Sequence, residues 1–200
     1  MVYSYLLIVL LAVFILSCGR PAGVGVGGRY LDAKSEMVKG VRGDLSKAIV
    51  NLEQVVVREP DYEDSLTLLG RAYYRAGRYQ DAYQILKRAL ALRPKDEIAW
   101  ISVGLTELRL GSDARGMESL KGGLTLLSKA STDGYRGFDS WDSEGSVRAA
   151  IRRTAFLVVK GLEEKESILR HGELLLARVD DEEWWGKRKR AREQAKPIND

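Results

Sequence analysis

The sequence predicts an all-α fold, an α-solenoid of about three helix pairs with a C-terminal helical cap. Gly43, Gly77 and Gly111 recur with a period of 34 residues, and columns of alanine, leucine and proline share that period. A constant period of this length is typical of stacked supersecondary units. Within residues 63–96, apolar side chains lie three or four positions apart, as on one face of an α-helix. Each unit is therefore expected to be a pair of helices.

The central unit shows why such a pair would form. Gly70 and Ala82 are small where the two helices are expected to cross, since larger side chains would push the helices apart. Gly77 suits the left-handed conformation that ends many helices. Pro94 stops the second helix, and Asp96 can cap the helix that follows. The signals for helix ends thus agree with the apolar spacing.

The residues of this unit also fit a known repeat family. They are Leu69, Gly70, Tyr73, Ala82, Leu86, Ala89 and Pro94. With these residues the unit resembles a tetratricopeptide repeat, and the units on either side resemble one less closely. The resemblance covers about half of the chain and implies a repeat array over residues 29–130. It also implies that the first helices of the units line a concave groove that binds segments of partner proteins.

The resemblance carries the groove-facing positions of the family onto residues of two units. In the central unit they are Asp64, Thr67, Arg71, Tyr74 and Arg75, and in the third unit they are Ile98, Ile101, Leu105, Leu108 and Arg109. One wall would be polar and cationic, with arginines that could hold a carboxylate or an acidic peptide. The other wall would be aliphatic, and exposed aliphatic side chains are unfavourable in a monomer. Either a C-terminal helix or a partner is therefore expected to cover that wall.

The start of the chain predicts export. Residues 2–17 are uncharged and mostly apolar, which is short for a membrane-spanning helix of about 20 residues but typical of a secretory signal peptide. Two aliphatic residues and Ser17 precede Cys18, the one cysteine of the chain, and this run resembles the lipobox of bacterial lipoproteins. The resemblance implies a signal peptide over residues 1–17 and a lipid on Cys18. An uncleaved N-terminal anchor is the alternative.

Glycine dominates the segment that follows the cysteine. Residues 18–28 are expected to hold no helix and to form a flexible tether between the lipid and the repeat array. Gly19 stands where an aspartate would signal retention in the inner membrane of enteric bacteria, so the outer membrane is favoured. The protein is thus expected to be lipid-anchored in the cell envelope and to face the periplasm.

The last third of the sequence predicts a loop and further helices. Residues 131–145 are rich in Gly, Ser and Asp and are expected to form a loop, whose aromatic side chains either pack on the solenoid or contact a partner. Residues 146–200 are expected to be capping helices and a basic tail. Four acidic residues, 180–183, precede two tryptophans and a basic run. This terminal helix is either solvated, with a tryptophan docked on the solenoid, or lies on an anionic bilayer.

The composition of the chain excludes several classes of function. One Cys and one His exclude a disulfide framework and a Cys/His zinc site, and a net charge of +4 is too small to indicate nucleic acid. No catalytic, metal or cofactor motif is recognisable, so no enzyme and no cofactor are expected. The expected function is a membrane-tethered scaffold lipoprotein that binds a protein partner in a bacterial envelope assembly. The alternative is a periplasmic, transporter-associated protein that handles a solute. An open groove would favour peptide binding, and a closed apolar pocket would favour the solute.

Overall fold

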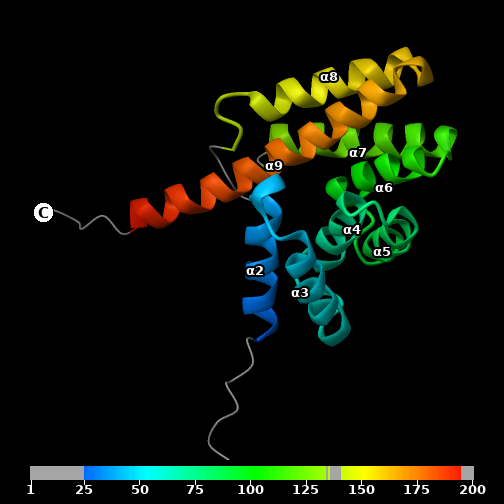
Figure 1. The fold of residues 1–200 in the computed structure, drawn as a ribbon. Helices are drawn as coiled ribbons and strands as arrows, with labels where there is room; N and C mark the ends of the chain where they lie inside the picture. The colour runs from blue at the N-terminus through cyan, green and yellow to red at the C-terminus, as the bar shows by residue number, and fades with distance from the viewer. Residues whose placement is uncertain (1–24, 134, 136–140, 195–200) are drawn as a thin grey trace, which may run out of the picture.

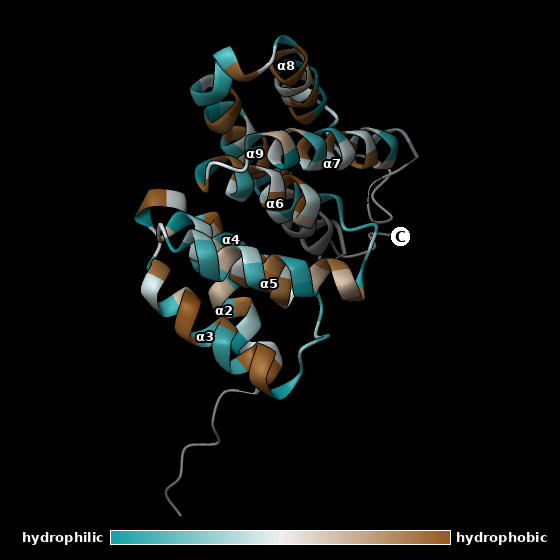
Figure 2. Cartoon of the chain, turned by 90° about the vertical axis from the view of Figure 1, so that its right-hand side faces the viewer, coloured by the Kyte–Doolittle hydropathy of each residue, from teal (hydrophilic) through white to brown (hydrophobic). Residues whose placement is uncertain are grey.

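The computed structural model describes residues 25–133, 135 and 141–194, and this part of the chain is built from helices (Figure 1). Its helices begin with stacked pairs that follow chain order (Figure 2). The first pair is α2 (Val26–Val38) and α3 (Leu45–Arg58), the second is α4 (Ser65–Arg75) and α5 (Tyr79–Leu92), and the third is α6 (Glu97–Arg109) and α7 (Asp113–Asp133). This arrangement confirms the predicted all-α solenoid of helix pairs.

Glycines allow the two helices of a pair to approach closely. A Cβ atom built on Gly70 would lie 2.4 Å from Cγ of Leu86 on the facing helix, as the small-residue argument predicts. In the third pair, a Cβ atom on Gly104 would lie 2.8 Å from the carbonyl oxygen of Gly116. Backbone atoms cannot withdraw as a side chain can, so the α6–α7 crossing depends more strictly on glycine than the α4–α5 crossing does.

The predicted helix ends are largely confirmed. Gly77 has a φ of +74° after α4, and the side chain of Asp96 caps α6 by accepting a hydrogen bond of 2.8 Å from the Ala99 amide. The first pair departs from this pattern. There the left-handed residue is Gly40 (φ +60°), which opens the short helix η1 (Gly40–Arg42), and Gly43 has an ordinary φ of −84°. The chain needs glycine at 43 because a Cβ atom would lie 1.9 Å from the Glu36 carbonyl oxygen.

The start of α2 corrects the predicted tether. α2 begins at Val26 and includes Gly27 and Gly28 in its first turn, so the expectation that residues 18–28 hold no helix is wrong for the last three of them. Residues 18–24 lie outside the described part of the chain. Gly27 lies against Tyr62, whose hydroxyl oxygen would be 3.0 Å from an added Cβ atom. Packing of α2 on its neighbours therefore outweighs the poor helix propensity of glycine.

Two further helices follow the third pair. α8 (Ser146–Lys160) packs on α7, a short turn η2 (Leu162–Glu164) follows, and α9 (Lys165–Gln194) returns along α8. α8 and the first part of α9 cover the C-terminal end of the solenoid, which is the predicted cap. The sequence did not predict that α9 would continue as one helix of 30 residues as far as α2 (Figure 1). No proline interrupts residues 165–194, so nothing local ends the helix earlier.

The segment predicted as a loop is shorter than residues 131–145, because α7 extends to Asp133. Tyr135 and Trp141 are both buried, and their rings stack with centroids 4.2 Å apart. These two aromatic residues therefore pack on the solenoid, one of the two alternatives that the sequence left open. The third, Phe138, lies outside the described residues. None of the helices in the described part of the chain is long and apolar enough to cross a membrane.

Candidate partner-binding groove

The first helices of the three pairs, α2, α4 and α6, form a concave face, and α9 lies in it. α9 contacts both α6 and α2. The contact with α6 is close: a Cβ atom built on Gly172 would lie 2.6 Å from Cδ2 of Leu105. Leu169 and Leu176 of α9 are buried in the same apolar cluster as α6. The predicted groove therefore exists, and the chain's own C-terminal helix occupies much of it.

The side chains of the predicted aliphatic wall are buried inside the protein. The four predicted groove residues Ile98, Ile101, Leu105 and Leu108 are at most 4% exposed. They pack with α7 and α9 in one hydrophobic cluster. Of the two ways of covering this wall that the sequence left open, coverage by a C-terminal helix is the one observed. In this conformation α7 and α9 cover these residues, which corrects the expectation that all four line a binding surface; of the four, Leu105 borders a cavity beside α9.

On the polar wall, Arg71 holds a carboxylate of the same chain. Its guanidinium donates two hydrogen bonds, of 2.8 Å and 2.6 Å, to the carboxylate of Asp180 on α9. Burial by itself would lower the pKa of Arg71, but the carboxylates of Asp180, Glu183 and Asp64 together outweigh burial and raise the pKa above its usual value. The arginine thus performs the predicted task of clamping an acidic group. Asp180 of the same chain is the carboxylate that Arg71 binds, where the sequence predicted an acidic group of a partner.

Tyr74 and Arg109 also bind α9. The Tyr74 hydroxyl donates a hydrogen bond of 2.6 Å to Glu173, and the Arg109 guanidinium lies 3.3 Å from the same oxygen. Burial, together with this hydrogen bond, raises the pKa of Tyr74, so its hydroxyl stays protonated at neutral pH. Arg75 instead donates to the carbonyl oxygens of Met37 and Gly40, at 2.8 Å and 2.7 Å. It therefore joins α4 to the end of α2.

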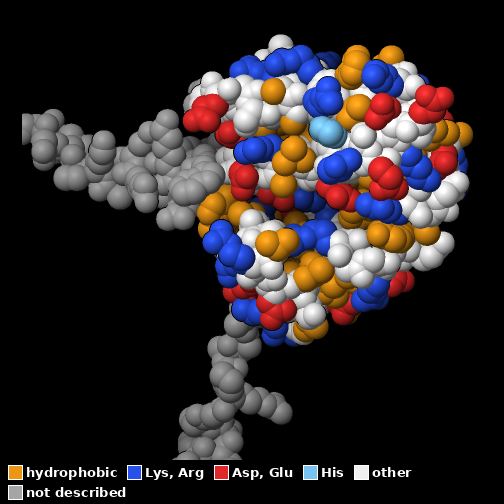
Figure 3. All heavy atoms as spheres, turned by 45° about the horizontal axis from the view of Figure 1, so that its top comes forward, with side chains coloured by type: hydrophobic (Ala, Val, Ile, Leu, Met, Phe, Trp, Pro, Cys, Tyr) orange, Lys and Arg blue, Asp and Glu red, His pale blue; other side chains and the backbone are white. Residues whose placement is uncertain are grey.

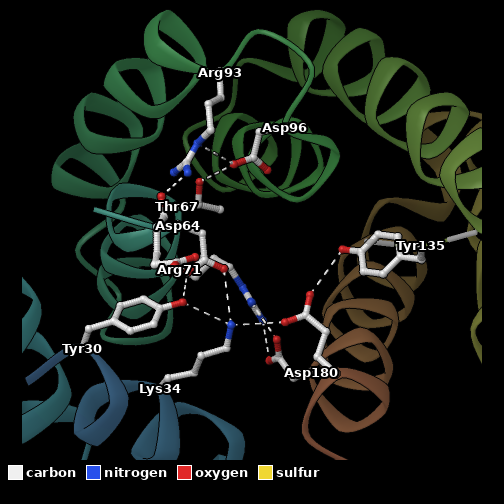
Figure 4. Close-up of polar contacts among 11 residues, drawn as sticks. Tyr30, Lys34, Asp64, Thr67, Arg71, Arg93, Asp96, Tyr135 and Asp180 are labelled. Carbon is white, nitrogen blue, oxygen red and sulfur yellow. Dashed lines mark hydrogen bonds and ion pairs between the residues drawn. The ribbon is translucent and has the colours of Figure 1, made fainter. Parts of the chain in front are cut away.

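The remaining predicted residues, Thr67 and Asp64, make polar contacts that join α4 to α6, α2 and α9 (Figure 4). Thr67 is buried and donates a hydrogen bond of 2.7 Å to Asp96. Asp64 accepts a hydrogen bond of 2.5 Å from the Tyr30 hydroxyl and lies 3.5 Å from the Lys34 ammonium. That ammonium also lies 3.2 Å from Glu183 of α9. Charges from helices far apart in the sequence are thus paired in a largely buried site.

Sequence reasoning missed the acidic side of α9. Glu173 and Asp180 are seven positions apart, a spacing that places two residues on one helix face. Together with the arginines on the predicted first helices, that spacing could have indicated an acidic helix face that pairs with the groove. Cys18, the predicted lipidation site, lies outside the described residues. Within the described ranges, no group of three or more His, Cys, Asp or Glu side chains could hold a metal ion.

Beside α9 the groove keeps a half-open cavity of about 620 Å³. Val41 lines it from η1, Leu45 from the start of α3, and Tyr79 from the start of α5. Leu105 and Leu176 line it from α6 and α9. Val41 is fully exposed. Charged residues of α4 and α9 also border the cavity, but most of its lining is apolar, so an apolar group from outside could enter it.

Comparison with known proteins agrees with the repeat assignment. A tetratricopeptide-repeat family model matches residues 42–103, which run from the end of η1 into α6. A protein of Arabidopsis thaliana described as a CTR9 homolog is 33% identical over 88 residues, which are 44% of this chain but only 8% of that protein. No solved structure matches the chain. The fold is thus an α-solenoid with tetratricopeptide repeats, and such repeats generally bind proteins.

Proposed function

We propose that this protein is a tetratricopeptide-repeat scaffold lipoprotein that binds a protein partner in a bacterial envelope assembly. A lipid on Cys18 would hold it in the cell envelope, at the outer membrane rather than the inner one, with the repeats facing the periplasm. The repeat match over residues 42–103 supports a role in protein binding. The apolar run that ends at the one cysteine of the chain supports the lipid anchor.

The cavity beside α9 carries the proposal. α9 already fills the deeper groove, so in the described part of the chain a partner segment would reach the groove through the space between η1 and α9. Its volume of about 620 Å³ and its mostly apolar lining suit one or two large apolar side chains of a partner segment. Exposed Val41 and partly buried Tyr79 would surround such an anchor at the mouth. Binding would thus bury apolar surface that the free protein exposes.

Photo-crosslinking in cells tests this site. With Val41 replaced by the photoreactive residue p-benzoylphenylalanine, we expect a discrete crosslinked band that contains one partner protein. Val57 on α3 is also strongly exposed but lies away from the cavity, so the same replacement there is the matched control. Position 74 is unsuitable, because Tyr74 is hydrogen-bonded to α9. Equal bands from both positions, or none from position 41 in folded and abundant protein, would contradict a partner site in the cavity.

The anchor has its own test. We expect Cys18→Ala to abolish incorporation of labelled palmitate and to leave the chain at the size of its precursor, because the thiol is the acceptor of the lipid. Gel mobility, fractionation and the mass of the N-terminal peptide would show these changes. Ser17→Ala keeps a small residue before the cysteine and is the control. A Cys18→Ala chain with the wild-type mature size and membrane retention would exclude the lipoprotein assignment.

The same cavity supports a second candidate function, a periplasmic, transporter-associated protein that handles a solute. Its volume of about 620 Å³ falls within the range of about 300–1,000 Å³ that is usual for small-molecule sites. Native mass spectrometry of the purified chain distinguishes the two functions. A small molecule that is retained by the wild type and lost in Ala177→Trp, which fills the cavity from α9, would favour the solute. A bare chain together with a protein crosslink at position 41 would exclude it.

A further inference from the structure

The outward side of α8 is a surface that the groove does not use. Its exposed residues are Arg148, Ala149, Arg152, Arg153, Phe156, Val159 and Lys160. At about 3.6 residues per turn they fall on one side of the helix. The opposite side, which includes Ile151 and Leu157, is buried in the cluster that α8 shares with α7 and α9. α8 contains no aspartate or glutamate, so every charge on its outward face is positive.

Apolar side chains occupy the C-terminal half of this face. Phe156 is 51% exposed and Val159 is 81% exposed. Basic groups flank the ring of Phe156: the Arg153 guanidinium lies 6.0 Å and the Lys160 ammonium 5.1 Å from its centre. Single exposed apolar residues are common on protein surfaces. Neighbouring ones with a charged rim are instead typical of interaction surfaces.

Most of the positive charge on this face is available to a partner. Arg148 is paired with Asp142, whose carboxylate lies 3.3 Å from its guanidinium. In the described part of the chain, no ion pair involves Arg152, Arg153 or Lys160. A binding partner with carboxylates would therefore gain these pairs without breaking existing ones.

The position of α8 at the end of the solenoid explains why its outward side has no helix packed against it. α8 packs on α7 and α9, and its other side is the place where the next helix of a longer array would stack. Terminal units of solenoids usually present a polar outer face. Figure 3, which brings the α8 end of the molecule forward, shows basic and hydrophobic side chains next to one another there. This end is thus suited to a helix supplied by another protein.

We propose that the outward face of α8 docks an acidic amphipathic helix of a partner protein. Apolar side chains of that helix would cover Phe156 and Val159, and its carboxylates would pair with Arg152 and Arg153. A second copy of this chain does not fit, because symmetric contact of the same face would bring like charges together. A bilayer fits less well, since α2, which follows the proposed anchor at Cys18, begins at the opposite end of the molecule from α8 (Figure 1).

Crosslinking from Phe156 tests the proposal in the full chain. With p-benzoylphenylalanine in place of Phe156, we expect a crosslink in cells to one protein, which mass spectrometry maps to an amphipathic helix rich in Asp and Glu. Arg152→Glu combined with Arg153→Glu is expected to reduce the crosslink about tenfold, because two attractive charges become repulsive. Lys87→Glu combined with Arg88→Glu makes the same charge change at two exposed residues of α5 and is expected to leave the yield unchanged.

Four results would overturn this proposal: an adduct with phospholipid, a crosslink to a second copy of the chain, a yield that does not respond to the arginine reversal, or no crosslink from folded and abundant protein. Thermal unfolding of each variant shows whether it is folded, and we expect unchanged midpoints because the altered side chains are exposed. Crosslinks from positions 41 and 156 are measured separately, so the proposed groove site and the proposed α8 site can be contradicted independently of each other.

Discussion

Replacing Asp180 by alanine is expected to lower the free energy of unfolding by about 3 kcal/mol, because it leaves the charge of Arg71 without its carboxylate. The side chains of Arg71 and Asp180 are 11% and 16% exposed, so water replaces little of the lost pairing. Chemical denaturation of the full chain measures the loss. Hydrogen exchange over residues 165–184 would show that α9 opens more often, since the pair holds this helix on α4.

A double variant separates the charge from the packing. Arg71→Met combined with Asp180→Leu removes both charges while keeping similar volume, and we expect it to recover most of the stability lost in Asp180→Ala. If Asp180→Ala alone unfolds at the same denaturant concentration as the wild type, the pair contributes nothing. The position of α9 in the groove would then rest on apolar packing and on its other polar contacts, those of Glu173 and Glu183.

Two adjacent glycines of α7 are expected to respond in opposite directions to alanine. A Cβ atom on Gly123 would lie 2.7 Å from the backbone nitrogen of Ile101 and 3.0 Å from Cβ of Trp100. Neither can move without shifting α6, so Gly123→Ala is expected to cost about 3 kcal/mol of unfolding free energy. Gly122 has no such neighbour within 4 Å. Gly122→Ala is therefore expected to add about 0.5–1 kcal/mol through the better helix propensity of alanine.

The two glycine variants are compared by their denaturation midpoints under identical conditions. Because the two positions share one helix and one substitution, helix propensity cancels in the comparison and the contact with α6 remains. Similar midpoints for both variants would mean that α6 and α7 do not cross as closely as described. Close packing of α7 would then not be what holds α6 and its aliphatic side chains in place.

Features that depend on neighbours within a turn or two were predictable from the sequence. The φ of +74° at Gly77 and the cap that Asp96 provides for α6 follow from local backbone chemistry. The period of 34 residues predicted stacked pairs, since each pair can bury its apolar side only against the next. The first turn of α2 could not be predicted in this way. Its glycines oppose a helix locally, and contacts such as that of Gly27 with Tyr62 decide otherwise.

By itself, the sequence determined a solenoid of helix pairs, and it predicted a groove with one cationic and one aliphatic wall. Only the tertiary structure decided what fills the groove. Arg71 and Asp180 are 109 positions apart, and no local pattern links them. Burial of Leu105 and pairing of Arg71 are gained only when α9 reaches the concave face. The occupant of the groove is therefore a property of long-range packing, which sums contacts that no single segment contains.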